Sequence, residues 1–145
     1  MIRAFTSQDM QAVLDIWLAA SLRAHHFIDP AFWTSQVEAM RTQYLPSADV
    51  FVHEDAGGIT GFSALVGQTL AALFVAPERQ GQGIGSQLLT HAKQRSPELN
   101  LTVYRDNPSS VAFYKAHGFS VAEESTDPHT GQVQYLMRCD FSVIG

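Results

Sequence analysis

The sequence predicts a mixed α/β domain in which helices flank a central, mostly antiparallel sheet, in the order βααβββαβαββ. The first observation is size: 145 residues, 46% hydrophobic and 16% charged, suit one core-forming domain over residues 1–145. The second is that apolar residues recur at helical spacing up to about residue 46 and at strand spacing from residue 49. The third is that only residues 69–105 read as strand, helix, strand, which excludes an alternating Rossmann-type sheet.

The N-terminal third is predicted to hold one strand and two helices. A strand is expected at residues 1–5, followed by a capping pair at Thr6 and Asp9 and by a first helix that ends near residues 24–29. A second helix is expected to begin at Asp29 and Pro30 and to end at Pro46. Residues spaced by three or four positions mark the inward face of each helix. They are Met10, Val13, Leu14, Trp17, Ser21 and Leu22 in the first helix, and Trp33, Val37, Met40 and Tyr44 in the second.

The remainder is predicted to hold six strands and two helices. The strands are expected at 49–55, 58–66, 69–76, 99–105, 119–125 and 132–139, with turns at 55–58 and 127–131. Residues 69–76 are apolar on both faces, which favours a central place in the sheet. Ile84, Leu88, Leu89 and Ala92 form one helix stripe, and Asn107 with Pro108 opens a short helix that ends near Gly118.

Composition excludes several classes of function. The net charge of −5 and the absence of a basic run exclude a large nucleic-acid footprint. No apolar run is long enough to span a membrane, and the first residues are too polar for a signal peptide, so we expect a cytoplasmic protein. Cys139 is the only cysteine, which leaves no internal disulfide, and the six histidines lack metal-ligand spacing.

Three glycines lie between a predicted strand and a predicted helix, at Gly81, Gly83 and Gly85. The first N–H groups of a helix lack intrahelical partners and carry partial positive charge, and glycine lets an anion approach them. This pattern predicts a phosphate or pyrophosphate site, with Arg79 as a cation at its edge. A P-loop would need a lysine, and a dinucleotide fold would need a third glycine where Ser86 stands. The alternative is that the glycines only form a tight turn.

Two motifs have a distinctive order and spacing. Residues 80–85 read QGQGIG, which matches the pattern Gln/Arg-x-x-Gly-x-Gly/Ala. Residues 107–119 read NPSSVAFYKAHGF, which matches Asn-x-x-(Ala)-x-x-Phe-Tyr-x-x-x-Gly-Phe, with Ser110 at the position of the optional alanine. Together they resemble the two hallmarks of the GNAT superfamily of N-acetyltransferases, and the resemblance covers the whole chain. It implies a splayed sheet, acetyl-CoA as co-substrate, and no metal.

The resemblance also implies a role for individual residues. The pyrophosphate of coenzyme A would lie on the glycine loop, the pantetheine arm would pair with the strand before it, and Asn107 would contact the cofactor in addition to capping a helix. Tyr114 would be the general acid that protonates the departing thiolate. The implied cofactor-binding residues are Phe74, Val75, Arg79, Gln80, Gly81, Gln82, Gly83, Gly85, Ser86 and Asn107.

The acceptor site and the base are less determined by the sequence. His25, Phe27 and Trp33 would line the acceptor pocket, or alternatively serve only in packing and capping. Thr102 stands where several relatives carry a glutamate, so the base is left open between Asp106 and a water relay that could involve His25.

The expected activity is direct acetyl transfer from acetyl-CoA to a primary amine in a ternary complex. Peptidyl lysine or an N-terminal amine is the favoured acceptor, and a small amine such as a polyamine or aminoglycoside is an alternative. A non-catalytic acyl-CoA-binding sensor is a second alternative. We expect a monomer or homodimer without nucleic-acid or membrane partners.

Overall fold

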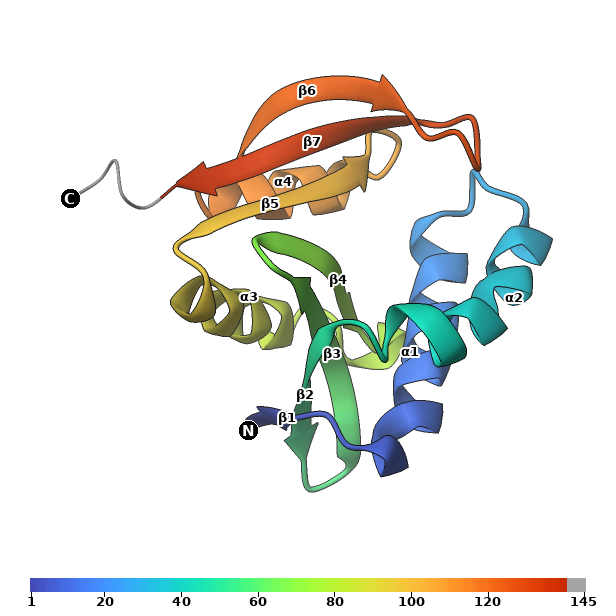
Figure 1. The fold of residues 1–145 in the computed structure, drawn as a ribbon, viewed down its shortest axis with the longest axis vertical. Helices are drawn as coiled ribbons and strands as arrows, with labels where there is room; N and C mark the ends of the chain where they lie inside the picture. The colour runs from blue at the N-terminus through green and yellow to red at the C-terminus, as the bar shows by residue number, and fades with distance from the viewer. Residues whose placement is uncertain (141–145) are drawn as a thin grey trace.

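The computed structural model describes residues 1–140, which form a seven-stranded sheet with helices against it (Figure 1). The element order is βααβββαβαββ, as predicted. The strands are β1 Ile2–Ala4, β2 Asp49–Asp55, β3 Gly58–Val66, β4 Thr69–Val75, β5 Glu98–Tyr104, β6 Ser120–Thr126 and β7 Val133–Asp140. The helices are α1 Met10–Ala24, α2 Pro30–Ala39, α3 Ile84–Arg95 and α4 Pro108–Ala116.

The sheet is split between β4 and β5. Its strand order is β1-β2-β3-β4-β5-β7-β6, and β4 with β5 is the parallel pair in an otherwise antiparallel sheet. Their register contains the single pair Thr69 and Asn100, whereas β3 pairs with β4 along its length. The two strands diverge beyond that pair (Figure 1). The expected splay is confirmed. Within residues 1–140, no strand pairs with the β5-facing edge of β4 from Leu70 to Val75.

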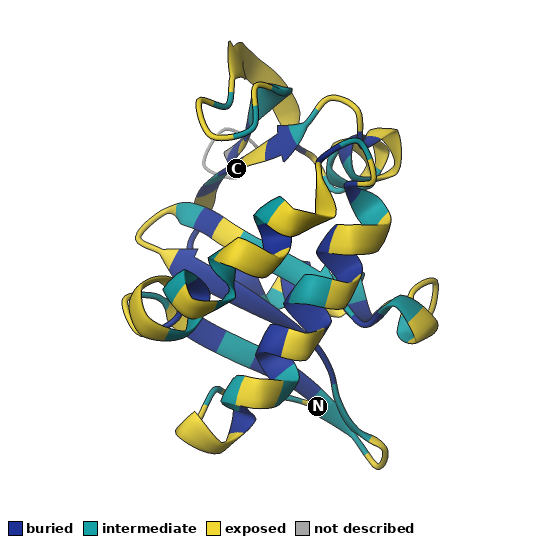
Figure 2. Ribbon diagram, turned by 90° about the vertical axis from the view of Figure 1, so that its right-hand side faces the viewer, coloured by how far each residue is buried: buried dark blue, intermediate teal, exposed yellow. Residues whose placement is uncertain are grey.

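Helices cover both faces of the sheet and create two cores. Helices α1 and α2 lie on the opposite side of β2–β4 from α3 (Figure 1). One core joins α1 and α2 to β2 and β3 through residues such as Val13, Trp17, Val52 and Phe62. The other joins α3 to β5 and β7 through residues such as Leu89, Leu101 and Met137. Buried positions follow these inward surfaces, while the outer helix faces and β6 are exposed (Figure 2).

Local hydrogen bonds explain where the helices begin. The Thr6 N–H donates to Asp9 Oδ2 at 2.8 Å, which confirms the predicted capping pair, although a short 3₁₀ turn at Ser7–Asp9 precedes α1. The Ala31 N–H donates to Asp29 Oδ1 at 2.9 Å at the start of α2. The Ser110 N–H donates to Asn107 Oδ1 at 3.4 Å at the start of α4. Both proline-led starts are therefore capped as the sequence predicts.

Two residues predicted on inward helix faces are exposed. Tyr44 is 54% exposed because the chain after α2 continues as a π-helical turn, Met40–Tyr44, closed by a bond from the Leu45 N–H to the Met40 carbonyl. The wider turn moves Tyr44 off the stripe of Trp33 and Met40. Leu22 is 38% exposed because, at about 100° per residue, it lies on the opposite side of α1 from buried Val13.

Candidate active site between the splayed strands

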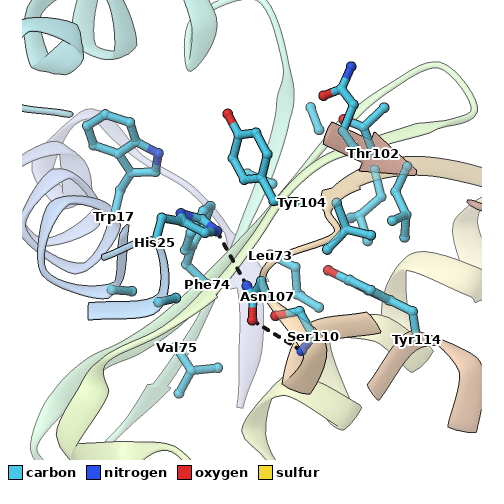
Figure 3. Close-up of a pocket in the computed structure, with 18 of the residues that line it drawn as sticks. Trp17, His25, Leu73, Phe74, Val75, Thr102, Tyr104, Asn107, Ser110 and Tyr114 are labelled. Atoms are coloured by element: carbon cyan, nitrogen blue, oxygen red, sulfur yellow. Dashed lines mark hydrogen bonds between the residues drawn. The ribbon is translucent and has the colours of Figure 1, made fainter. Parts of the chain in front are cut away.

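Two adjacent cavities lie where β4 and β5 separate. The glycine-loop cavity, about 430 Å³, is bounded by residues 79–86 and α4. The aromatic cavity, about 350 Å³, is bounded by β4, β5 and rings from α1 and α2 (Figure 3). The residues that line both are Ala24, Leu73, Val75, Gln80, Asn107, Ser110 and Tyr114. A ligand that follows the free β4 edge therefore passes from one cavity to the other.

Gly81 and Gly83 are glycines because their backbone conformation disfavours any residue with a side chain. Their φ angles are +81° and +84°, in the left-handed region, and Gly83 caps α3. Gly85 has no such need, because a Cβ there would make only ordinary contacts of 3.6–3.8 Å with Phe113 and Val75. The tight-turn alternative thus explains two glycines, and Gly85 is left as a position where a bare backbone lines a cavity.

The start of α3 presents unpaired backbone donors to the glycine-loop cavity. The helical bonds begin with the Gln87 N–H, which donates to the Gly83 carbonyl at 3.1 Å. The N–H groups of Ile84, Gly85 and Ser86 precede that bond, and all three residues line the cavity. This arrangement can bind a phosphate or pyrophosphate group.

Arg79 lines the glycine-loop cavity and contacts the side chains of Asp55 and Gln82. It forms an ion pair with Asp55, which lowers the pKa of that carboxyl, and its Nε donates to Gln82 Oε1 at 3.0 Å. Gln80 Nε2 donates to the Val75 carbonyl at 3.2 Å, at the end of β4. Arg79 and Gln80 line the cavity, whereas Gln82 does not. Gln82 therefore contacts Arg79 rather than the cavity through its side chain.

His117 is a neighbour of the glycine loop that the sequence did not single out. Its Nδ1 lies 2.8 Å from the Phe113 carbonyl, so this nitrogen carries a proton, and its Nε2 lies 3.1 Å from Ser86 Oγ. His117 thereby holds the Ser86 side chain. Its place inside the 107–119 motif was the available signal.

His25 lies at the wall of the aromatic cavity, buried and neutral at pH 7. Burial lowers its pKa to about 4. Its ring stacks on Trp33, with centroids 5.1 Å apart, and meets Tyr104 edge-on at 5.1 Å. Because Asn107 Oδ1 accepts from Ser110, Asn107 Nδ2 faces His25 Nε2 at 3.4 Å (Figure 3). His25 Nε2 therefore accepts, and the ring proton is on Nδ1.

Of the other two expected acceptor-site residues, one lines the aromatic cavity and one does not. Trp33 lines the aromatic cavity, whereas Phe27 lines neither cavity and packs behind its wall against His25 and Tyr104 at 5.8 and 5.7 Å. Phe74 lines only the aromatic cavity. The structure adds Trp17, Tyr104 and Asp127 to the lining, and no local spacing in the sequence connects these three.

Tyr114 lies where the two cavities meet. It projects from α4 with its hydroxyl pointing into the cavity (Figure 3), and its ring packs edge-on against Phe113 and Phe119 at 5.2 and 5.6 Å. Burial raises the pKa of the Tyr114 phenol well above its usual range, so the hydroxyl keeps its proton at neutral pH. A phenol that is protonated and unpaired within residues 1–140 can donate to a ligand atom at this junction.

The positions considered for the general base differ in whether they line a cavity. Thr102 lines the aromatic cavity. Asp106 is half-exposed, lies 3.8 Å from Arg105 and lines neither cavity. Within residues 1–140 no group of His, Cys, Asp or Glu is arranged to hold a metal ion, and no helix is long and apolar enough to cross a membrane.

Residues 46–121 match the family described as acetyltransferase (GNAT) domain. The chain belongs to this family, and it is an N-acetyltransferase whose acetyl donor is acetyl-CoA, as the two motifs implied. It is 35% identical over 138 residues to peptidyl-lysine N-acetyltransferase YiaC of Escherichia coli K12, with 94% of each chain covered. It is 33% identical to peptidyl-lysine N-acetyltransferase YjaB of Salmonella typhimurium, again with 94% of each covered.

Solved structures show the same fold. The apo form of YjaB from Escherichia coli superimposes with a TM-score of 0.85 at 29% identity, covering 95% of each chain. PaiA N-acetyltransferase from Thermoplasma acidophilum, solved with coenzyme A, gives a TM-score of 0.77 at 20% identity, covering 97% and 98%. The split mixed sheet is therefore the fold of this family.

Proposed function

We propose that this protein acetylates the side-chain amine of lysine in a peptide or protein, by direct attack on acetyl-CoA. The observation that carries the proposal is the meeting of the two cavities at Tyr114, along the β5-facing edge of β4, which no strand of the described chain pairs beyond Thr69. One cavity has the unpaired N–H groups of a helix start, suited to a diphosphate. The other is walled by aromatic rings and open to an acceptor.

The cofactor is assigned to the glycine-loop cavity and the β4 edge. The pyrophosphate contacts the backbone of residues 81–86 with Arg79 beside it, and the pantetheine arm lies along Phe74 and Val75. Asn107 contributes from the shared wall while its Oδ1 caps α4. Acetyl-CoA placed this way puts its thioester near Tyr114.

The chemistry is a single displacement. The neutral amine attacks the thioester carbon, the carbon–sulfur bond breaks, and the coenzyme A thiolate takes the proton of the Tyr114 hydroxyl. Solvent then returns a proton to the phenolate, and the proton lost by the amine leaves to water. Removing that amine proton is the step without an assigned side chain.

The acceptor assignment draws on the names of the relatives, which are peptidyl-lysine N-acetyltransferases at 32–35% identity. The test incubates the protein with acetyl-CoA and a lysine peptide, and follows free thiol and peptide mass. Acetylation of the lysine side chain supports the proposal. Acetylation of only a polyamine, an aminoglycoside or a peptide N-terminus reassigns the acceptor, and binding of acetyl-CoA without any transfer supports the sensor alternative.

Several expectations from the sequence belong with this proposal. We expect one domain over residues 1–145, a cytoplasmic location, and a monomer or homodimer that binds neither nucleic acid nor membrane. Gel filtration with light scattering measures the oligomeric state directly.

A further inference from the structure

We propose that Asp127 binds the ammonium group of the incoming lysine and so selects cationic acceptors for the aromatic cavity. This inference rests on the proposed function, since it concerns the acceptor half of the same site. Asp127 follows β6 directly and lies in the turn to β7, where its N–H donates to the Gln132 carbonyl at 2.9 Å. Asp127 is among the residues that line the aromatic cavity.

The first argument is the charge of the cavity. Within the described chain, Asp127 is the one carboxylate among the lining residues of the aromatic cavity, and no lysine or arginine is among them. His25 is neutral there at pH 7 because burial lowers its pKa to about 4. The opposite end, the glycine-loop cavity, has the partial positive charge of the α3 start at residues 84–86 and Arg79, which is paired with Asp55. A positive end for a diphosphate and a negative end for an ammonium ion give the site complementary charge for both substrates.

The second argument is that the carboxylate is fixed in place. Asp127 Oδ2 accepts from the Tyr104 hydroxyl at 2.6 Å, and Oδ1 accepts from the His129 N–H at 2.9 Å. Burial raises the pKa of Asp127, but the hydrogen bonds from Tyr104, His129 and Thr130 together lower it below its ordinary value. A carboxylate that stays ionised is a good partner for an ammonium ion and a poor proton acceptor, so the ammonium ion bound there loses its proton to water before the neutral amine attacks the thioester.

The third argument is the chemistry of the walls. Trp17, Trp33 and Tyr104 line the same cavity, and the two tryptophan rings meet edge-on at 5.8 Å. Aromatic rings favour both a hydrocarbon stem and a cation. An unbranched alkylammonium chain, which is the lysine side chain, combines the two features that this lining recognises.

The test uses the two tryptophans of the sequence as reporters, because both line the cavity. Tryptophan fluorescence of the coenzyme A-loaded protein is titrated with a lysine peptide and with the same peptide carrying norleucine, its uncharged counterpart. We expect the lysine peptide to bind roughly 10-fold more tightly, as for a charge-assisted hydrogen bond. Asp127→Asn should reduce that ratio to about 2-fold or less by the same principle. Asp106→Asn, an equal charge change outside both cavities, should keep it.

Kinetics give a second readout. Asp127→Asn should raise KM for the lysine peptide by about 10-fold while KM for acetyl-CoA stays unchanged. A lysine preference that survives in Asp127→Asn overturns the inference. If that variant fails to fold, salt titration of the wild-type protein decides: binding of the lysine peptide must weaken with salt more than binding of the norleucine peptide. A wild-type protein that prefers lysine yet transfers no acetyl group refutes the proposed function and leaves the ammonium site intact.

Discussion

Tyr114 is the residue on which the chemistry depends most. Tyr114→Phe keeps the ring that packs on Phe113 and Phe119 and removes the proton donor. We expect kcat to fall by about ten-fold or more, the usual contribution of general acid catalysis, with little change in acetyl-CoA affinity. Steady-state kinetics with a lysine peptide measure the effect.

Tyr44→Phe is the matched control, since Tyr44 is exposed and lines neither cavity. It should leave kcat unchanged. If Tyr114→Phe turns over at the wild-type rate, thiolate protonation comes from elsewhere.

Burial of His25 in the wall of the aromatic cavity makes the stability of the fold depend on pH. The folded chain holds this ring with a pKa of about 4, whereas an unfolded chain protonates it below about 6.5. The unfolded state therefore binds more protons between these values, and the stability lost through His25 grows as pH falls across that window and levels off below it. His25→Gln should lose less melting temperature between pH 7 and pH 5 than the wild type.

His26→Gln is the control for this titration, because His26 is the exposed neighbour of His25. Its pH profile should follow the wild type. Parallel profiles for all three proteins would contradict a buried neutral His25.

At the scale of elements, two glycines at the start of α3 are expected to have different roles, Gly83 in folding and Gly85 in cofactor binding. Gly83→Ala forces a side chain into the left-handed region and should destabilise the protein by about 1–2 kcal/mol. Gly85→Ala replaces glycine in a helix at a position with only ordinary contacts, so stability should hold or rise by up to about 1 kcal/mol. The added methyl group lies beside the glycine-loop cavity and should raise KM for acetyl-CoA several-fold.

Chemical denaturation and acetyl-CoA kinetics on the two variants check this division. A Gly85→Ala protein that is destabilised and binds acetyl-CoA normally would assign Gly85 to folding instead.

The sequence predicted elements well where the signal was local. Caps such as Asp29 with Pro30 and Asn107 with Pro108 act within one turn, so both helix starts were predicted. The failures came from context. The π turn at Met40–Tyr44 moved Tyr44 to the surface, and its hydrogen bonding has no simple residue signature.

The site shows the same division. The glycine loop and Tyr114 belong to short contiguous motifs, and the structure brings them together at adjoining cavities. Asp127 lies 23 positions after Tyr104 in the chain, and the two meet only because β5 pairs with β7, with Tyr104 opposite Gln134. Pairing of this kind depends on the whole fold, so the acidic end of the aromatic cavity was not predictable from spacing.

At the scale of the whole molecule, cofactor binding should stabilise the fold. Acetyl-CoA at about 100 times its Kd should raise the melting temperature by at least about 5 °C. Hydrogen exchange should slow at the N–H groups of Ile84, Gly85 and Ser86 and along residues 70–75. ATP at the same concentration should give neither effect, and protection that is absent from both segments would contradict the assigned binding mode.

The single Thr69–Asn100 pair between β4 and β5 has a mechanical consequence. The pair is reinforced by the Thr69 hydroxyl, which donates to Asn100 Oδ1 at 2.9 Å, and by a shared core in which Leu65 and Leu70 pack in one cluster with Leu101 and Met137. A ligand that fills the gap between β4 and β5 can therefore form hydrogen bonds with the β4 backbone in place of the missing strand pairs. We therefore expect bound acetyl-CoA to supply the hydrogen-bond partners that the β4 backbone lacks within residues 1–140, and so to tie the two halves of the sheet together more tightly.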